Sequence, residues 1–206
     1  MRKWLLPAMI IACAVLVSIV VYADLPQQMV IHFNSQNEAD NWLSRPLGAF
    51  LLPTIAVFIC LIITLAMKLE RDVQKRQRNE ASLGTLLSAI SFTLLLVHLF
   101  IIAHNLGYAL SAAVAACLLS GFIFIALGNT LPRLTQSSFN RPMLSPTAER
   151  RFSRLIGRLM IATGILFLLV ALLPQSLIFP IFFVLLATFI ILMLSILFRY
   201  SRMHAE

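Results

Sequence analysis

The stretch that organises the chain is DLPQQMVIHFNSQNEADNWLSRPLGAFLLP, residues 24–53. It is the one long polar segment in a sequence that otherwise consists of apolar runs and short basic connectors. Of the 206 residues, 60% are hydrophobic and only 12% are charged, whereas soluble domains have about 45–50% apolar and about 25% charged residues. The composition therefore excludes an ordinary soluble domain and indicates a membrane protein. In such a protein, residues 24–53 would form the largest polar surface.

The apolar runs that flank this stretch are long enough to cross a bilayer, which takes about 20 residues in a helix. There are six, at residues 4–22, 47–67, 83–103, 108–127, 155–173 and 177–198. Ionisable side chains are almost absent from them. We expect an all-α integral membrane protein with six transmembrane helices and one sizeable extracytoplasmic loop, between the first two helices.

The basic residues predict how these helices are oriented. With the N-terminus inside, 15 of the 16 Lys and Arg residues fall on the cytoplasmic side, and only Arg45 falls outside. Cytoplasmic loops carry an excess of basic residues, so both termini are predicted to be cytoplasmic (N-in, C-in). The net charge of +8 is then a topology signal, and we expect no direct binding of nucleic acid.

Residues 1–23 leave a second interpretation open. Arg2, Lys3, the apolar run and the small residue Ala23 resemble a signal peptide and its cleavage site. Because the run is longer than the usual h-region, we favour a retained first helix. Cleavage would leave five spans with the same sidedness.

The spans and connectors divide the chain into predicted domains. Residues 1–68 form a two-span N-terminal domain with outer loop 23–46, residues 69–82 a basic cytoplasmic connector, and residues 83–206 a four-span C-terminal domain with cytoplasmic connector 129–154. In the first connector, Asp72 and Arg76 have the spacing of an ion pair along a continuing helix.

The second connector is predicted to end in an amphipathic helix. Pro146 and Glu149 are typical of a first helical turn. Arg150, Arg154 and Arg158 follow at four-residue steps, which places them on one helix face. That face would contact lipid phosphates or, alternatively, a cytoplasmic partner.

Within the outer loop, residues 29–33 have the β-branched and aromatic character of a strand. Residues 34–37 are typical of a turn, in which Asn37 can adopt a left-handed conformation. We expect a polar loop packed around Phe33 and Trp42.

A cation site is the alternative for this loop, since His32, Glu38 and Asp40 fall close together in the sequence. Their spacing matches no standard motif, so we expect no metal. Cys13, Cys60 and Cys117 all lie in spans, which argues against a disulfide framework or a metal site.

His98 is the intramembrane polar candidate, because an ionisable residue inside a span is often functional, for example as a proton carrier. No span contains an Asp or Glu as its partner. We therefore favour a neutral, hydrogen-bonded packing histidine.

Small residues in two spans predict close helix packing. Ala112, Ala116 and Ser120 recur at four-residue steps, with the small residues Ala109, Ala113 and Gly121 nearby, and Gly157 and Gly164 lie one heptad apart. Such patterns let helix backbones approach each other. Packing within the chain is favoured over a dimer seam, and the oligomeric state is left open.

Several short motifs of the outer segment and the second span form a recognisable set. They are Leu25 with Pro26, His32 with Phe33 and Asn34, Asp40 with Asn41 and Trp42, and Gly48 with Pro53. In this order they resemble the N-terminal domain of unknown function of the SdpI-type immunity family. These are bacterial membrane proteins related to the immunity factor against a sporulation-delaying toxin. Asn37 stands where the family has a turn glycine, and Arg45 where it has lysine.

The second half of the resemblance lies near the second connector. The matching residues are the run 128–133 (GNTLPR), Asn140, Arg154 and Gly157, with Phe152 in place of a tryptophan. The Gly-Ile-Arg-Thr-Pro-Trp run of the family is shortened here to Arg141 and Pro142.

The resemblance implies a multi-pass immunity or toxin-sensing protein of the bacterial cytoplasmic (inner) membrane. Such a protein would recognise a secreted antimicrobial peptide and signal to a cytoplasmic regulator. The implied recognition residues are His32, Asn34, Asp40 and Trp42 outside, and Asn129, Arg133 and Arg154 inside. The outer loop has three acids and one base, which favours a cationic ligand.

Two other functions remain open. A small transporter or permease component would use His98, although transporters usually show paired intramembrane charges or interrupted helices. A structural membrane subunit would assemble through residues such as Ala112 and Ala116. Phosphate loops, metalloprotease motifs and nucleophile elbows are absent from the sequence, so we expect no enzyme activity and no cofactor.

Overall fold

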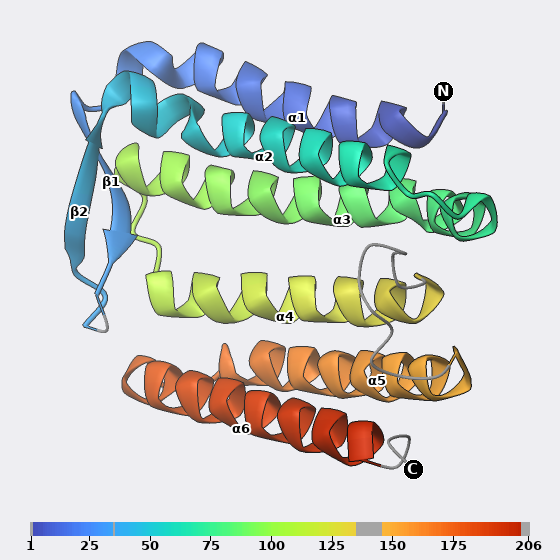
Figure 1. The fold of residues 1–206 in the computed structure, drawn as a ribbon. Helices are drawn as coiled ribbons and strands as arrows, with labels where there is room; N and C mark the ends of the chain where they lie inside the picture. The colour runs from blue at the N-terminus through green and yellow to red at the C-terminus, as the bar shows by residue number, and fades with distance from the viewer. Residues whose placement is uncertain (1, 35, 135–145, 203–206) are drawn as a thin grey trace.

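The structure is a computed structural model that describes residues 2–34, 36–134 and 146–202, and these residues are mostly helical (Figure 1). The elements in chain order are α1 (Arg2–Val21), the 3₁₀ turn η1 (Tyr22–Asp24), β1 (Gln28–Phe33), β2 (Ala39–Ser44), α2 (Arg45–Lys68), α3 (Val73–Asn105), α4 (Ala112–Thr130), the 3₁₀ turn η2 (Leu131–Arg133), α5 (Pro146–Val170) and α6 (Gln175–Arg202). Consecutive helices run in opposite directions. The strands therefore lie at one end of the molecule, the hairpin end. Helix α2 ends with Lys68 and η2 ends with Arg133 at the other end, which we call the basic end.

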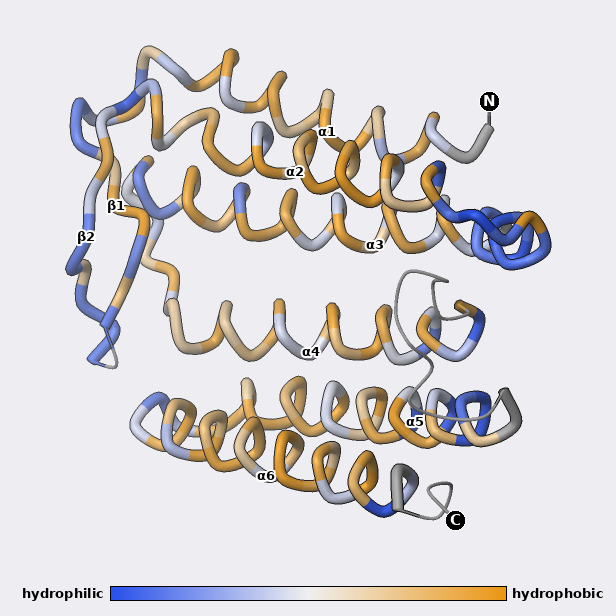
Figure 2. Tube along the Cα trace, viewed as in Figure 1, coloured by the Kyte–Doolittle hydropathy of each residue, from blue (hydrophilic) through white to orange (hydrophobic). Residues whose placement is uncertain are grey.

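Six of the described helices are long and apolar enough to cross a membrane. The candidate spans are Trp4–Asp24, Arg45–Lys68, Ser82–Asn105, Ala112–Arg133, Ala148–Val170 and Gln175–Tyr200. Figure 2 shows hydrophobic residues through the middle of the molecule and hydrophilic ones at its two ends. The chain has the features of a multi-pass membrane protein, while the side that each end faces stays a prediction.

Helix α3 extends well beyond its span into the segment expected to be a connector. It begins at Val73 because Asp72 caps it: the Asp72 carboxylate accepts hydrogen bonds from the backbone N–H groups of Gln74 (2.9 Å) and Lys75 (3.1 Å). A capped N-terminus satisfies backbone donors that a helix otherwise leaves free. The Asp72 carboxylate thus caps the helix through one of its oxygens, and its pairing with Arg76 stays a prediction.

The outer loop is a β-hairpin, which the all-α expectation did not include. Strand β1 pairs antiparallel with β2 in the register Gln28↔Ser44, Met29↔Leu43, Val30↔Trp42, with an irregularity after Val30. The β-branched and aromatic residues 29–33 predicted the first strand, and no comparable run predicted the second. Ala39, Asp40 and Asn41 are poor strand formers, so β2 depends on its pairing with β1.

Met29 joins the hairpin to the membrane helices. Its side chain is fully buried together with Leu25, Ala49, Ile101 and Ile102. Gly48 makes room for it, because a methyl group on Gly48 would lie 2.9 Å from the sulfur of Met29. The glycine at the start of α2 thus fixes how closely the hairpin sits on the bundle.

The helices pack as two groups of three. Apolar clusters join α1, α2 and α3 on one side and α4, α5 and α6 on the other. Phe92 of α3 contacts Phe122 of α4 between the groups, with ring centroids 5.3 Å apart. The domain boundaries expected at residues 68 and 83 stay predictions, and Asn140, Arg141 and Pro142 lie outside the described residues.

The two glycines of α5 pack against two glycines of α4. A methyl on Gly157 would lie 2.5 Å from the carbonyl oxygen of Gly128, and one on Gly164 would lie 2.7 Å from that of Gly121. The close-packing face predicted from Gly157 and Gly164 is confirmed.

The close-packed face predicted for α4 is confirmed in part. Of the predicted residues, Ala112, Ala113 and Gly121 are buried, whereas Ala116 and Ser120 are half-buried. Cys117 lies between Ala113 and Gly121 at the same four-residue spacing and is also buried.

Candidate functional site

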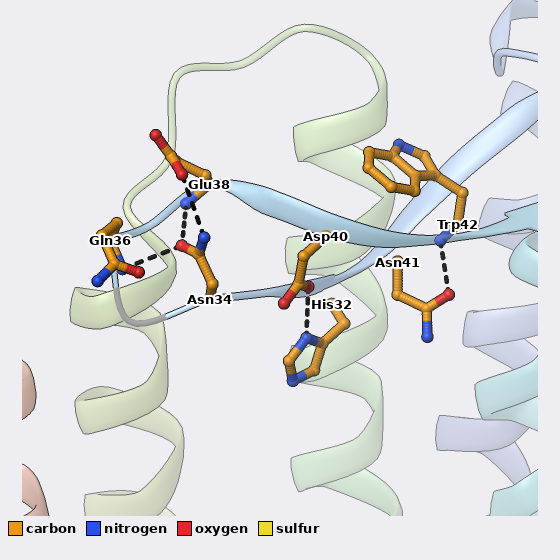
Figure 3. Close-up of polar contacts among 7 residues, drawn as sticks. All are labelled: His32, Asn34, Gln36, Glu38, Asp40, Asn41 and Trp42. Carbon is orange, nitrogen blue, oxygen red and sulfur yellow. Dashed lines mark hydrogen bonds and ion pairs between the residues drawn. The ribbon is translucent and has the colours of Figure 1, made fainter.

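The turn of the hairpin is organised by Asn34. Its side-chain oxygen accepts hydrogen bonds from the backbone N–H groups of Gln36 (3.0 Å) and Glu38 (2.9 Å), and its amide nitrogen donates to the Glu38 carboxylate at 3.1 Å (Figure 3). Asn37 has φ +66°, the left-handed conformation predicted for it. The side chain of Asn34, a sequence-predicted recognition residue, is thus engaged within the turn.

His32 and Asp40 face each other across the two strands. Nδ1 of His32 lies 2.6 Å from a carboxylate oxygen of Asp40, and both side chains are largely exposed (Figure 3). Glu38 does not join them, because it contacts Asn34. The structure therefore brings together two of the three residues proposed for a cation site.

Trp42 lies on the outer strand with 48% of its surface exposed. Its backbone N–H donates to the side-chain oxygen of Asn41 at 2.9 Å (Figure 3). Phe33 packs against Phe100 and His104 instead, with centroid distances of 5.8 and 4.6 Å. The expected packing around both Phe33 and Trp42 is right for Phe33 and wrong for Trp42, which is an exposed aromatic surface.

One edge of the hairpin is attached to α3 by an asparagine that sequence reasoning missed. The side chain of Asn105 accepts from the backbone N–H of Val30 (2.8 Å) and donates to the carbonyl oxygen of Val30 (2.9 Å). It thereby occupies backbone groups on the edge of β1 that does not face β2. The tight turn next to Asn105, in which Gly107 has φ +93°, was the feature of the sequence that could have indicated this contact.

The tip of the hairpin is attached to α4. The side-chain oxygen of Asn37 accepts from the backbone N–H groups of Ala112 (2.6 Å) and Ala113 (3.3 Å). Ser111 caps the same helix through Val114. One hairpin therefore connects to both helix groups, through Asn105 on α3 and Asn37 on α4.

A cleft of about 320 Å³ lies beside this tip, between the hairpin turn and the start of α6. Its lining residues are Gln36, Asn37, Ala113, Gln175, Ser176 and Phe179. They provide side-chain amides, a hydroxyl and one aromatic ring, and none of them is ionisable. No sequence-predicted site residue lines the cleft. The turn predicted at residues 34–37 and the short polar break at residues 174–176, between the last two predicted spans, were the signal that could have indicated it.

His98 is buried between three helices on the hairpin side of the bundle. The Ser18 hydroxyl of α1 lies 2.6 Å from the carbonyl oxygen of Ala49 and 3.0 Å from Nε2 of His98. Pro53 lacks the N–H that would otherwise bond to the Ala49 carbonyl, so Ser18 replaces the missing donor. Because the hydroxyl has one proton, the network assigns the donor role in the second bond to Nε2 of His98.

The other candidates lie at the basic end. Nη2 of Arg133 donates to the side-chain oxygen of Asn129 at 3.2 Å, in an exposed contact. Arg150, Arg154 and Arg158 are all exposed on α5. Arg133 ends η2 and the three arginines lie in the first half of α5, so together they form a basic surface at the end of the molecule away from the strands, where Figure 2 shows hydrophilic residues.

Residues 9–57 match the model of a protein family described as a domain of unknown function, DUF1648. The matched part includes most of α1, both strands and the first half of α2. No curated protein and no solved structure matches the chain. The chain is therefore a multi-pass membrane protein that carries a DUF1648 domain, and this domain contains the hairpin.

Proposed function

We propose that this protein is an immunity or toxin-sensing protein of the bacterial cytoplasmic membrane, which recognises a secreted antimicrobial peptide at its hairpin end. The resemblance of its motifs to the SdpI-type family supports this proposal. The basic surface of Arg150, Arg154 and Arg158 is assigned to lipid phosphates or to a cytoplasmic regulator.

The cleft beside the hairpin tip is the observation that carries the proposal. The Gln175 amide, the amide nitrogen of Asn37 and the Ser176 hydroxyl offer donors and acceptors that match a peptide backbone, and Phe179 offers an apolar contact. Ligand pockets typically combine apolar walls with a few polar groups in this way. A peptide held there would contact both the DUF1648 domain and the last helix.

The negative charge of the hairpin supports binding of a cationic peptide less than the sequence suggested, because its charged side chains already have partners. Asp40 faces His32, and Glu38 bonds to Asn34. Arg45, the base of this loop, lies over the ring of Tyr22, 5.6 Å from its centroid. The proposed recognition therefore rests on hydrogen bonding and on the exposed Trp42, and less on attraction of a cationic peptide.

The test is survival of a toxin-sensitive bacterium that expresses the chain, challenged with sporulation-delaying-type peptide and with culture supernatant of the source organism. Ser176→Trp fills the cleft and should abolish protection. Leu172→Trp is the matched control, because Leu172 is 81% exposed in the same turn and does not line the cleft.

Both variants are compared at equal membrane abundance, together with Trp42→Ala, which should weaken protection. Full protection by Ser176→Trp would contradict recognition at the cleft. Absence of protection by the parent chain against every source would contradict the immunity function itself.

A further inference from the structure

A second concave surface lies at the opposite end of the molecule. It is a groove of about 300 Å³ between the first turns of α1 and the last turns of α2. Trp4, Ala8 and Ile11 line it from α1, and Leu61, Thr64 and Lys68 line it from α2. The groove runs along the helices, since Trp4 and Ile11 are separated by about 10 Å of helix rise.

The walls of the groove suit a hydrocarbon chain. The Thr64 hydroxyl donates a hydrogen bond to the carbonyl oxygen of Cys60 in its own helix. Thr64 therefore needs no polar ligand as a partner. The other wall residues are apolar, and Leu61 is 59% exposed. An elongated apolar groove parallel to the helix axes has the direction of an acyl chain in a bilayer.

The rim of the groove, in contrast to its apolar walls, carries a positive charge. Lys68 is exposed at the last residue of α2, at the basic end of the molecule. Trp4 lies at the same end, and tryptophan is enriched where a membrane protein meets the headgroup layer. A lysine above an apolar groove is complementary to an anionic headgroup whose acyl chain lies in the groove.

We propose that this groove is a binding site for one anionic phospholipid, with an acyl chain between α1 and α2 and the phosphate at Lys68. The site is independent of the hairpin end and of the function proposed for it. Among the described side chains that line the groove, Lys68 is the one that carries a charge, and it is the contact assigned to the phosphate.

The test uses the fluorescence of Trp4. The chain has two tryptophans, so Trp42→Phe leaves Trp4 as the single reporter in the full-length protein. This chain is reconstituted into phosphatidylcholine vesicles that contain an equal minor fraction of either phosphatidylglycerol or phosphatidylcholine with brominated acyl chains. Bromine quenches tryptophan on contact, so the ratio of the two quenching constants measures the lipid preference at the groove.

We expect a ratio of about five for the parent, the preference that one basic contact near an anionic surface gives. Lys68→Gln should bring the ratio close to one, whereas Arg78→Gln, which removes a charge outside the groove, should not. Ala8→Phe fills the groove and should also remove the preference. Its control is Met9→Phe, at a position that is 61% exposed and does not line the groove.

A ratio near one in the parent would overturn the proposal, and so would a ratio that survives Ala8→Phe. Weak quenching by both brominated lipids would show that a protein helix occupies the groove, and this result would also overturn it.

Discussion

At the hairpin end, side-chain amides hold backbone from distant parts of the chain, whereas along the α4–α5 seam two helix backbones meet directly. Asn105 and Asn37 connect the hairpin to α3 and α4 through four hydrogen bonds of 2.6 to 3.3 Å. At the seam, the backbone of Gly128 lies so close to Gly157 that no methyl group fits between them. The position of the hairpin thus depends on four hydrogen bonds from two side chains, while the position of α4 against α5 depends on the absence of side chains.

The largest effect is expected from breaking the seam. Gly128→Leu places a side chain against the carbonyl oxygen of Gly157, where even a methyl would lie 2.6 Å away. Overpacking of this kind should lower the free energy of unfolding by about 3 kcal/mol. Denaturant titration of the protein in mixed micelles measures it. Ala116→Leu, at a half-buried position off the seam, should cost clearly less, and equal costs would contradict the assigned phase of α4.

Removing the attachment to α3 should have the next largest effect. Asn105→Leu leaves the N–H and carbonyl groups of Val30 without their partner, at a cost of about 1–3 kcal/mol. The amide of Val30 should then exchange its hydrogen at least about tenfold faster, as measured by mass spectrometry. Asn41→Ala, which removes a bond at the exposed edge of β2, should leave that exchange rate unchanged.

The contact of Ser18 with the Ala49 carbonyl and His98, in the helices beneath the hairpin, can be tested with a second, compensating substitution. Ser18→Ala leaves the Ala49 carbonyl and Nε2 of His98 without the hydroxyl, which should cost about 1 kcal/mol for a bond within a membrane bundle. Pro53→Ala restores an N–H to α2 that can bond to Ala49. The double variant should therefore lose less stability than the sum of the two single variants, and strict additivity would contradict this account of the Pro53 position.

The smallest effect is expected at the exposed pair of the hairpin. Asp40→Asn removes the charge that faces His32, but both side chains are largely in solvent. The free energy of unfolding at neutral pH should change by less than about 1 kcal/mol. A larger loss, in the same denaturant titration, would mean that the pair holds the hairpin together and that the two asparagine attachments do not.

The spans, the left-handed Asn37 and the glycine face of α5 could be predicted because each follows from local sequence. Hydrophobic length determines a span, and the heptad spacing of Gly157 and Gly164 is visible without any partner. Strand β2 and the Asn105 contact to Val30 could not be predicted, because they depend on segments far apart in the chain. The exposure of Trp42 was missed for the same reason: Phe33 takes the packing position beside Phe100 and His104.

The cleft was also beyond local sequence. Gln36 and Ser176 are ordinary turn residues by themselves, and they become a site only because Asn37 places the hairpin tip on α4, next to the start of α6. The outer residues expected from the resemblance, His32, Asn34, Asp40 and Trp42, lie in the same hairpin as Gln36 and Asn37, and their roles stay predictions.

Recognition of a secreted peptide requires that the hairpin end faces the outside of the cell. In a variant with Cys13, Cys60 and Cys117 replaced by alanine, single cysteines are introduced at Gln36 on the hairpin and at Arg78 at the basic end. A membrane-impermeant maleimide is then applied to intact cells. Labelling of position 36 in intact cells, and of position 78 only after lysis, is the result we predict. The reverse pattern would place the hairpin in the cytoplasm and contradict recognition of a secreted peptide.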